Sequence, residues 1–235
     1  MIKAILLDSG YVLSRPSCGH WMVTQNFYDY VNKKAYKSFS KKQRHDAFLS
    51  GMAYLRRIDR MASKTEEVFH FTEFYRLVFK KLGMLLPERN FERLAEDMVY
   101  NPNKYLFYDD VYRYLPVFKE SYKLGLVSDA WPSLHDVYEE AGLKKYFDAF
   151  TISTEVGYGK PRREIYEKTM VQMGVSPGDC LYVDDRISNC QGANQAGIKE
   201  TYLLCRNPLV YWYRRLTCKD HTVINGLKQL EERIQ

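Results

Sequence analysis

Acidic residues stand at three points of this chain where a short apolar run ends. Asp8 follows the run AILL, Asp129 follows LGLVS, and Asp184 and Asp185 follow CLYV. Apolar runs of this length are typical of buried strands. An acid at the end of such a strand is either a surface cap or a reactive group held by a rigid scaffold. A fourth run, FTIS, is followed by TEVGYGKP, which contains Lys160.

These polar residues are expected to meet, because ligands of an open parallel sheet bind beyond the carboxyl ends of its strands. Two carboxylates about 4 Å apart repel by on the order of 4 kcal/mol at an effective dielectric constant near 20. Asp8, Asp184 and Asp185 therefore predict a bound divalent cation, and ligation by oxygen alone favours Mg²⁺. The Ser128 hydroxyl and the Lys160 ammonium group would hold phosphate oxygens beside it.

An alternative interpretation is that Asp184 and Asp185 only cap the helix that follows them, since acids are favoured near helix starts. That interpretation gives no role to Asp8 or Lys160. The convergence of four separate segments on one sheet edge therefore favours a binding site over a set of unrelated caps.

The elements that must position these residues alternate between strands and helices. From about Tyr108 onward, short apolar strands are separated by helical patterns of 10 to 15 residues, which is typical of βαβ units. From about Ser14 to about Lys104 only helical spacing is found. Pro116 predicts a kink or a break in one helix, and Pro161 is expected to begin another.

The predicted fold class is therefore α/β, with a Rossmann-like parallel sheet flanked by helices. An all-helical domain is inserted after strand 1, because a segment of this length is too long for a loop. We expect the sheet domain to comprise residues 1–14 and 105–235, and the helical insertion to comprise residues 15–104.

Taken in order, four motifs resemble those of the haloacid dehalogenase superfamily. They are ILLDSGYVL, LVSDA, GKPRREIY and LYVDDRISNCQGANQAG. The last is the most specific, because it combines a double acid with a helix of small residues. The helical insertion after strand 1 is similar to that of the family's helical-cap subgroup, so the resemblance covers the whole chain. Most members of this superfamily are Mg²⁺-dependent phosphatases.

The resemblance implies a role for each motif residue. Asp8 would be the nucleophile that attacks phosphorus and forms an aspartyl phosphate. The metal ligands would be the side chains of Asp8, Asp184 and Asp185 and the backbone carbonyl of Gly10. The phosphate-binding residues would be Ser128, Asp129 and Lys160.

Two positions depart from the family's pattern. Most phosphatases of the superfamily have a second aspartate, a general acid and base, where this chain has Gly10. A subgroup with the first motif D-x-G-x-V shares this glycine. Either the substrate has a good leaving group or another residue donates the proton, and Tyr11 and His20 are candidate donors. Asp129 replaces the usual asparagine and adds a negative charge where phosphate should bind.

The sequence leaves two function classes open. The first is a phosphohydrolase that acts on a small phosphorylated metabolite, such as a sugar or nucleotide phosphate. The second is a catalytically weak or inactive relative that binds a phosphorylated ligand or partner. The natural substrate, the oligomeric state, and the choice between hydrolysis and phosphotransfer remain open.

The composition of the chain indicates which kinds of partner and which cellular compartment to expect. The net charge of +6 favours anionic ligands in general, and no known nucleic-acid motif accompanies it, so no nucleic-acid partner is expected. No stretch approaches the roughly 20 apolar residues of a membrane span, so no membrane partner is expected. The five cysteines have no C-x-x-C spacing, which indicates a reducing compartment and predicts a cytoplasmic protein.

Overall fold

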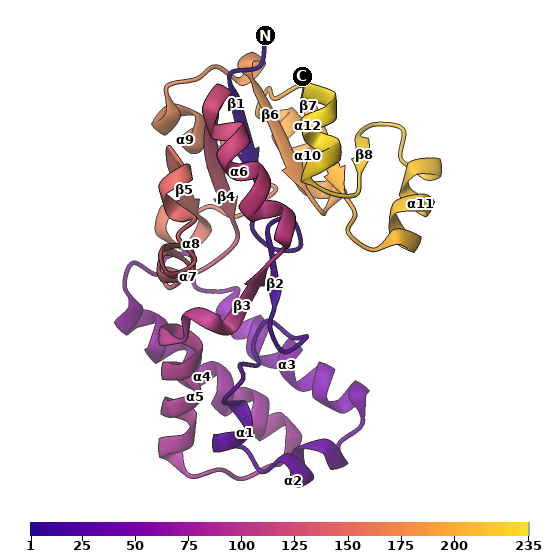
Figure 1. Ribbon diagram of the computed structural model, residues 1–235. Coiled ribbons are helices and arrows are strands. Elements are labelled where there is room, and N and C mark those ends of the chain that lie inside the picture. The colour runs from indigo at the N-terminus through magenta and orange to yellow at the C-terminus, as the bar shows by residue number, and fades with distance from the viewer. Residues whose placement is uncertain (235) are drawn as a thin grey trace. The chain divides into compact units, whose positions relative to one another are not determined.

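The computed structural model describes residues 1–234, which divide into two compact units (Figure 1). The sheet unit comprises Met1–Arg15, Leu106–Ala130 and the chain from Tyr138 onward. The helical unit comprises Pro16–Tyr105 together with Trp131–Val137. The short segment Trp131–Val137 therefore packs with the helices, although it follows a strand of the sheet unit in the sequence.

A six-stranded parallel sheet forms the centre of the sheet unit, in the order β5-β4-β1-β6-β7-β8. Its strands are β1 (Ala4–Leu7), β4 (Lys123–Ser128), β5 (Ala149–Ile152), β6 (Cys180–Asp184), β7 (Glu200–Leu204) and β8 (Thr222–Ile224). Leu7 pairs with Leu126 on one side and with Val183 on the other. Because β1 lies between β4 and β6, the residues that follow these three strands meet at one edge. The predicted α/β parallel sheet is confirmed.

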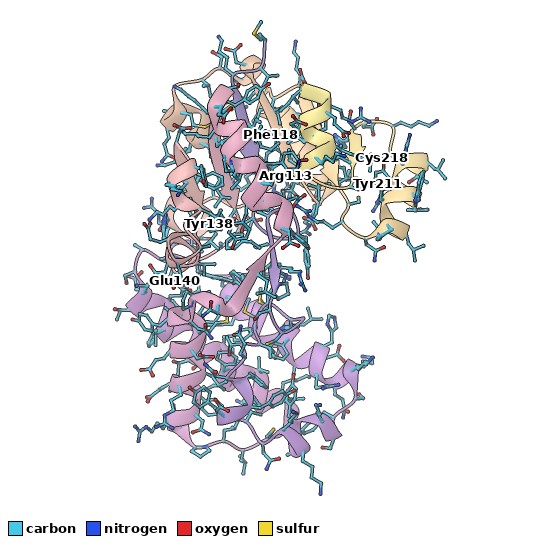
Figure 2. The ribbon with its side chains drawn as sticks, viewed as in Figure 1. Arg113, Phe118, Tyr138, Glu140, Tyr211 and Cys218 are labelled. Carbon is cyan, nitrogen blue, oxygen red and sulfur yellow. The ribbon has the colours of Figure 1, made fainter. Side chains whose placement is uncertain are left out.

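Helices cover both faces of this sheet (Figure 1). Those that pack against its strands include α6 (Asp109–Ser121), α9 (Arg163–Met173), α10 (Ile187–Gln195) and α12 (Leu227–Ile234). The chain also forms α7 (Leu134–Glu140, which begins in the helical unit), α8 (Ser153–Val156) after β5, and α11 (Pro208–Thr217) beside β8. α6 and α12 pack on each other, as do α9 and α10. Tyr211 is the buried residue of α11, and Cys218 packs in the same cluster (Figure 2).

The break considered for Pro116 and the helix start expected at Pro161 are both absent from the structure. α6 runs through Pro116 without ending there, because that residue lies inside a helix packed against the sheet. Pro161 does not begin a helix, since α9 starts at Arg163 and Arg162 is its N-cap.

The helical unit contains α1 (Phe27–Tyr30), α2 (Lys33–Ser38), α3 (Lys41–Leu55), α4 (Lys64–Leu82) and α5 (Glu88–Tyr100). The face of α4 that repeats every three to four residues is buried, including Phe71, Phe74 and Val78. Ser40 forms a capping box with Gln43 at the start of α3. Trp131 packs edge-on against Phe71, with ring centroids 5.0 Å apart.

The segments that join the two units contain short strands. β2 (Ser14–Pro16) lies where only helical signals were found, and it pairs with β3 (Tyr105–Phe107). Within residues 1–234, no helix combines the length and apolar composition required to cross a bilayer.

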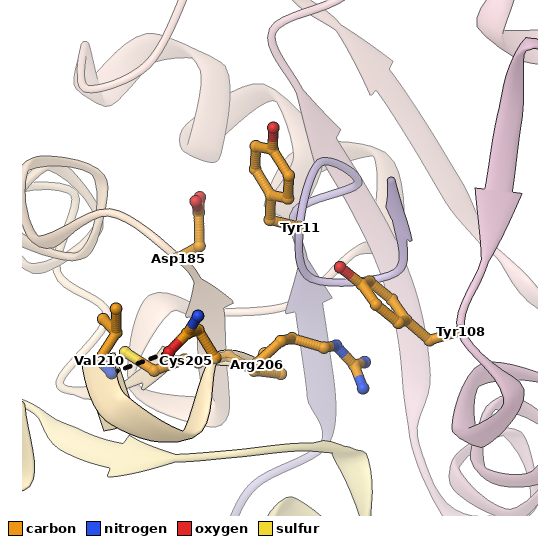
Figure 3. A pocket seen from close by; sticks show the side chains of 8 residues that line it. Tyr11, Tyr108, Asp185, Cys205, Arg206 and Val210 are labelled. Atoms are coloured by element: carbon orange, nitrogen blue, oxygen red, sulfur yellow. Dashed lines mark hydrogen bonds between the residues drawn. The ribbon is translucent and has the colours of Figure 1, made fainter. Parts of the chain in front are cut away.

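The carboxyl edge of the sheet carries a pocket of about 250 Å³ (Figure 3). Residues that follow β1, β6 and β7 line it, among them Tyr11, Asp185 and Arg206. The pocket lies entirely within the sheet unit.

Candidate active site

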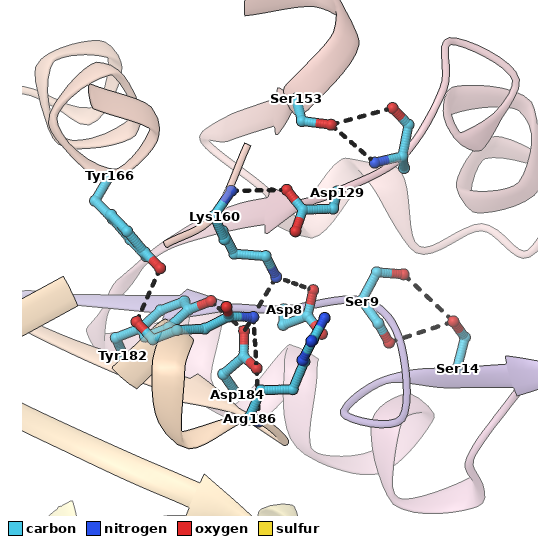
Figure 4. Close-up of polar contacts among 12 residues, drawn as sticks. Asp8, Ser9, Ser14, Asp129, Ser153, Lys160, Tyr166, Tyr182, Asp184 and Arg186 are labelled. Atoms are coloured by element: carbon cyan, nitrogen blue, oxygen red, sulfur yellow. Dashed lines mark hydrogen bonds and ion pairs between the residues drawn. The ribbon is translucent and has the colours of Figure 1, made fainter. Parts of the chain in front are cut away.

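Asp8, Lys160 and Asp184 form a buried ion-paired cluster at the carboxyl edge of the sheet (Figure 4). Lys160 Nζ lies 2.5 Å from Asp8 Oδ1 and 3.0 Å from Asp184 Oδ2. The exposed fractions of these side chains are 2% for Lys160, 9% for Asp8 and 0% for Asp184, so solvent screens the cluster little. The sequence-predicted meeting of the segments that follow β1, β5 and β6 is therefore present.

Asp184 is held in place by three further donors. The Tyr182 hydroxyl donates to Oδ2, and Asn189 Nδ2 lies 3.1 Å from both carboxylate oxygens. The backbone N–H of Arg186 donates to Oδ1 at 2.8 Å, which is a contact of the helix-capping kind. Asp184 therefore does assist the start of α10, but its other oxygen faces the cluster.

Asp129, the residue after β4, supports the loop that carries Lys160. Ser128 is the last residue of β4 and is buried. Asp129 Oδ1 accepts the backbone N–H of Lys160 at 2.8 Å. Burial raises the pKa of the Asp129 carboxyl, although the Lys160 charge opposes the shift. The acid that departs from the family's pattern is thus a positioning group for Lys160 in this structure.

Each of the carboxylates of Asp8, Asp184 and Asp185 has an oxygen within 4.8 Å of the others. Burial raises the pKa of Asp8 well above its usual value, with Lys160 opposing and Asp184 adding to the shift. Burial and the Asp184 charge raise the pKa of Asp185 to about 7. Burial lowers the pKa of Lys160, but Asp184 and Asp8 raise it by more, so the ammonium group stays charged.

This electrostatic pattern fits a divalent cation. The donors are all oxygens, as Mg²⁺ prefers, and one lysine does not balance three clustered carboxylates. A cation among them would remove the repulsion that raises the pKa of Asp185. The candidate metal-ligating side chains are therefore together, as predicted.

Gly10 lies in a tight loop after β1. Ser9 O accepts the backbone N–H groups of Leu13 and Ser14, both at 2.9 Å, and the Tyr11 N–H donates to Ser14 O at 2.7 Å. Tyr11 has φ = 57°, in the left-handed region that favours glycine. The loop therefore holds a conformation that its sequence does not prefer.

The two candidate proton donors belong to different units. Tyr11 lines the pocket that also contains Asp185. His20 lies in the helical unit, where its Nδ1 accepts the Met22 N–H at 3.2 Å and its ring centroid is 4.3 Å from that of Phe48. Burial lowers the pKa of His20.

Sequence reasoning missed the residues that support the charged cluster. Tyr182 was assigned only to a buried strand and Asn189 only to a helix, yet both bind Asp184. Gly192 belongs to the helix of small residues in the last sequence motif. A Cβ at Gly192 would lie 2.2 Å from Pro161 O, so α10 closely contacts the loop that carries Lys160. The sequence feature that could have pointed to Asn189 is its position five residues after Asp184, in the helix that comes next.

Comparison with known proteins finds a family model that resembles part of the chain. The model of the haloacid dehalogenase-like hydrolases matches residues 87–197, which include every candidate metal-ligating and phosphate-binding residue except Asp8 and Gly10. Over these residues the chain is similar to the haloacid dehalogenase-like hydrolases. Asp8 lies outside the matched residues, and its place in the cluster comes from the geometry described above. Gly10 also lies outside them, in the loop that follows β1.

One curated relative is the glyceraldehyde 3-phosphate phosphatase of Methanopyrus kandleri, which is 31% identical over 114 residues. These residues cover 44% of this chain and 47% of the relative, so the match spans about half of each protein.

Solved structures of proteins with two different activities share the fold of this chain. The phosphatase from Thermococcus onnurineus is 22% identical with a TM-score of 0.66, covering 99% of this chain and 98% of its own. The L-2-haloacid dehalogenase from Xanthobacter autotrophicus is 18% identical with a TM-score of 0.69, covering 100% and 98%. The fold alone therefore does not distinguish phosphate chemistry from dehalogenation.

Proposed function

We propose that this chain is a Mg²⁺-dependent phosphohydrolase that acts on a small phosphorylated metabolite, such as a sugar or nucleotide phosphate. The observation that carries the proposal is the cluster of Asp8, Asp184 and Asp185, with an oxygen of each carboxylate within 4.8 Å of the others. Haloalkane displacement needs a single nucleophilic carboxylate and gives no role to two further acids. The relative named a glyceraldehyde 3-phosphate phosphatase supports the same class of substrate.

The metal would be held by the side chains of Asp8, Asp184 and Asp185 and by the Gly10 carbonyl. Bound there, Mg²⁺ would supply positive charge that lowers the pKa of the acids and binds a phosphoryl oxygen.

Asp8 is the proposed nucleophile. Its carboxylate forms a bond to phosphorus while the bond from phosphorus to the substrate's ester oxygen breaks. Water then attacks phosphorus, releases inorganic phosphate and restores the Asp8 carboxylate. Dividing the reaction in this way replaces one difficult step by two easier ones.

Lys160 and Ser128 are the proposed phosphoryl-binding groups. The ammonium group of Lys160, now 2.5 Å from Asp8, is close enough to hold an oxygen of a phosphoryl group attached to that residue. Most of the catalysis in such reactions comes from positioning and from charge stabilisation on the equatorial oxygens. Asp129 contributes by fixing the backbone at Lys160.

We further propose that residues 15–104 act as a helical cap that selects the substrate. This segment contributes most of the helical unit. Its arginines and aromatic side chains would meet the part of the substrate that does not react.

Hydrolysis of p-nitrophenyl phosphate by the wild type, with and without Mg²⁺, tests the proposal. We expect Mg²⁺-dependent release of p-nitrophenol that Asp8→Asn lowers by at least about 10³-fold, because the amide cannot form the aspartyl phosphate. Wild-type turnover no higher than that of Asp8→Asn would favour the second function class, a relative that binds phosphorylated ligands without hydrolysing them. The negative charge of Asp129 and the missing acid at Gly10 are the features consistent with that class.

A further inference from the structure

Arg206 joins the end of β7 to the loop after β1. Its Nε and Nη2 donate to the Val12 carbonyl at 3.2 and 2.6 Å, and its Nη1 donates to Asp110 Oδ2 at 2.8 Å. Two hydrogen bonds from one guanidinium group to one carbonyl fix the orientation of that peptide group more closely than a single donor would. The exposed fractions of the Arg206 and Asp110 side chains are 16% and 22%, so the ion pair is largely shielded from solvent.

Neighbouring groups hold the guanidinium group itself in place. Its central carbon lies 3.9 Å from the centre of the Tyr108 ring, within the range of a cation–π contact (Figure 3). Asp110 Oδ2 also accepts the Leu227 N–H at 2.9 Å. A Cβ at Gly226 would lie 3.0 Å from that same oxygen, so the close approach of this segment favours glycine.

The loop held by Arg206 is the one that needs support. Tyr11, the residue before Val12, has φ = 57°, a conformation that costs a non-glycine residue on the order of 1 kcal/mol. Such a residue persists where the surrounding contacts determine its backbone. The Tyr108 N–H adds a further contact by donating to Leu13 O at 3.1 Å.

We propose that Arg206 is a positioning residue that fixes the loop Ser9–Ser14, and through it the Gly10 carbonyl, by binding Val12 O while Asp110 and Tyr108 hold its guanidinium group. The inference rests on the proposed function, in which the Gly10 carbonyl is a metal ligand. Arg206 acts only through the loop and has no part in the chemical step.

Hydrogen exchange of the loop tests this role without reference to activity. In Arg206→Ala and in the milder Arg206→Lys, we expect the amides of Tyr11, Leu13 and Ser14 to exchange at least about tenfold faster than in the wild type. The amides of β1 and β6 should be unchanged. Arg113→Gln is the matched control, because Arg113 also lies over a tyrosine ring, that of Tyr114, but makes this contact within α6.

A second readout is the Mg²⁺ concentration for half-maximal hydrolysis of p-nitrophenyl phosphate. Loss of a residue that supports a metal ligand typically weakens metal binding or activity by 10–100-fold, so we expect an increase of about tenfold or more for Arg206→Ala. Added guanidinium ion should reverse part of this increase, because it can bind Val12 O in the space left by the side chain.

The outcomes separate this inference from the proposed function. A wild type that does not hydrolyse p-nitrophenyl phosphate would overturn the proposed function, whatever the rate of hydrogen exchange in the loop Ser9–Ser14. An active wild type whose loop exchange and Mg²⁺ requirement are unaltered in both Arg206 variants would overturn the role of Arg206. Faster exchange spread evenly over the sheet would also overturn it, because that result would mean that Arg206 stabilises the whole unit rather than the loop.

Discussion

Lys160 Nζ lies 2.5 Å from Asp8 Oδ1, which joins the proposed nucleophile to the loop after β5 by a buried ion pair. The same ammonium group lies 3.0 Å from Asp184 Oδ2. One cation thus links the ends of the neighbouring strands β1 and β6, because Asp8 follows β1 directly and Asp184 is the last residue of β6. When a phosphoryl group binds, Lys160 can exchange part of these contacts for phosphoryl oxygens without leaving the cluster.

Replacing Lys160 with methionine should destabilise the metal-free protein. Removing one partner of a buried ion pair typically costs about 3–5 kcal/mol, because the other charge stays buried and unpaired. We expect the free energy of unfolding of Lys160→Met, measured by urea denaturation in EDTA, to fall by about that amount. Mg²⁺ should reduce the difference, since it supplies positive charge to the same acids.

Lys168→Met, at an exposed position of α9, is the control for Lys160→Met. Its free energy of unfolding should change by less than about 0.5 kcal/mol, as is usual for surface substitutions. A Lys160→Met protein as stable as the control in EDTA would contradict the ion-paired cluster.

The stabilising effect of Mg²⁺ should depend on pH. The pKa of Asp185 is raised from 3.8 to about 7 by burial and by the Asp184 charge. The folded, metal-free protein therefore keeps a proton that the unfolded chain releases, and the stability from this group is lost as the pH rises through about 7.

Because metal binding requires the deprotonated carboxylate, Mg²⁺ should raise the melting temperature more at about pH 8 than at about pH 5. Differential scanning fluorimetry with and without Mg²⁺ measures this difference. Equal shifts at both pH values would mean that these acids do not bind the metal, and Asp185→Asn should lessen the pH dependence.

Gly192→Ala should disturb the candidate active site indirectly, by changing how α10 packs against the loop that carries Lys160. The added Cβ would lie 2.2 Å from Pro161 O, so either α10 or the loop that carries Lys160 must move. Overpacking of this kind typically costs about 1–3 kcal/mol. We expect a comparable loss of stability and a lower kcat.

Gly178→Ala is the matched control for Gly192→Ala, because an added Cβ there has no neighbour within 4 Å. Its stability and kcat should stay close to those of the wild type. A Gly192→Ala protein that behaves like this control would show that α10 does not constrain the loop.

The sequence was sufficient to predict the sheet and the clustered acids, since both follow from local patterns. Apolar runs ending in Asp8 and Asp184 indicate strands and their carboxyl ends directly. The supporting contacts could not be predicted in the same way. Tyr182 stands inside the apolar run CLYV like any core aromatic, and only the tertiary structure places its hydroxyl against Asp184.

Residues distant in sequence were the hardest to assign. Arg206 lies 194 positions from Val12, and no local pattern joins them. The segment Trp131–Val137 comes soon after β4 in the sequence but belongs to the helical unit, through contacts such as that of Ser133 N–H with Glu67 Oε2, at 2.8 Å. Such pairings depend on how the elements fold together rather than on the periodicity within each one.

The missing acid at Gly10 should make turnover depend on the leaving group. A positioned general acid typically contributes 10²–10⁴-fold, so kcat/KM for p-nitrophenyl phosphate should exceed that for an alkyl phosphate by a factor of about that size. Gly10→Asp should narrow this ratio. Tyr11→Phe and His20→Gln test the two candidate donors. If either residue donates the proton, its variant should lose kcat/KM for the alkyl phosphate, which has the poor leaving group, and keep it for p-nitrophenyl phosphate. Equal kcat/KM for esters of very different acidity would contradict this interpretation of Gly10.

The central claim is that Asp8 carries the phosphoryl group, and mass spectrometry of the acid-quenched enzyme tests it most directly. Wild-type protein mixed with p-nitrophenyl phosphate and Mg²⁺ should yield the peptide containing Asp8 with one added phosphoryl group. Asp8→Asn treated in the same way should yield none. An active wild type whose Asp8 peptide stays unmodified at every quench time, or a phosphoryl group found on another residue, would contradict the account.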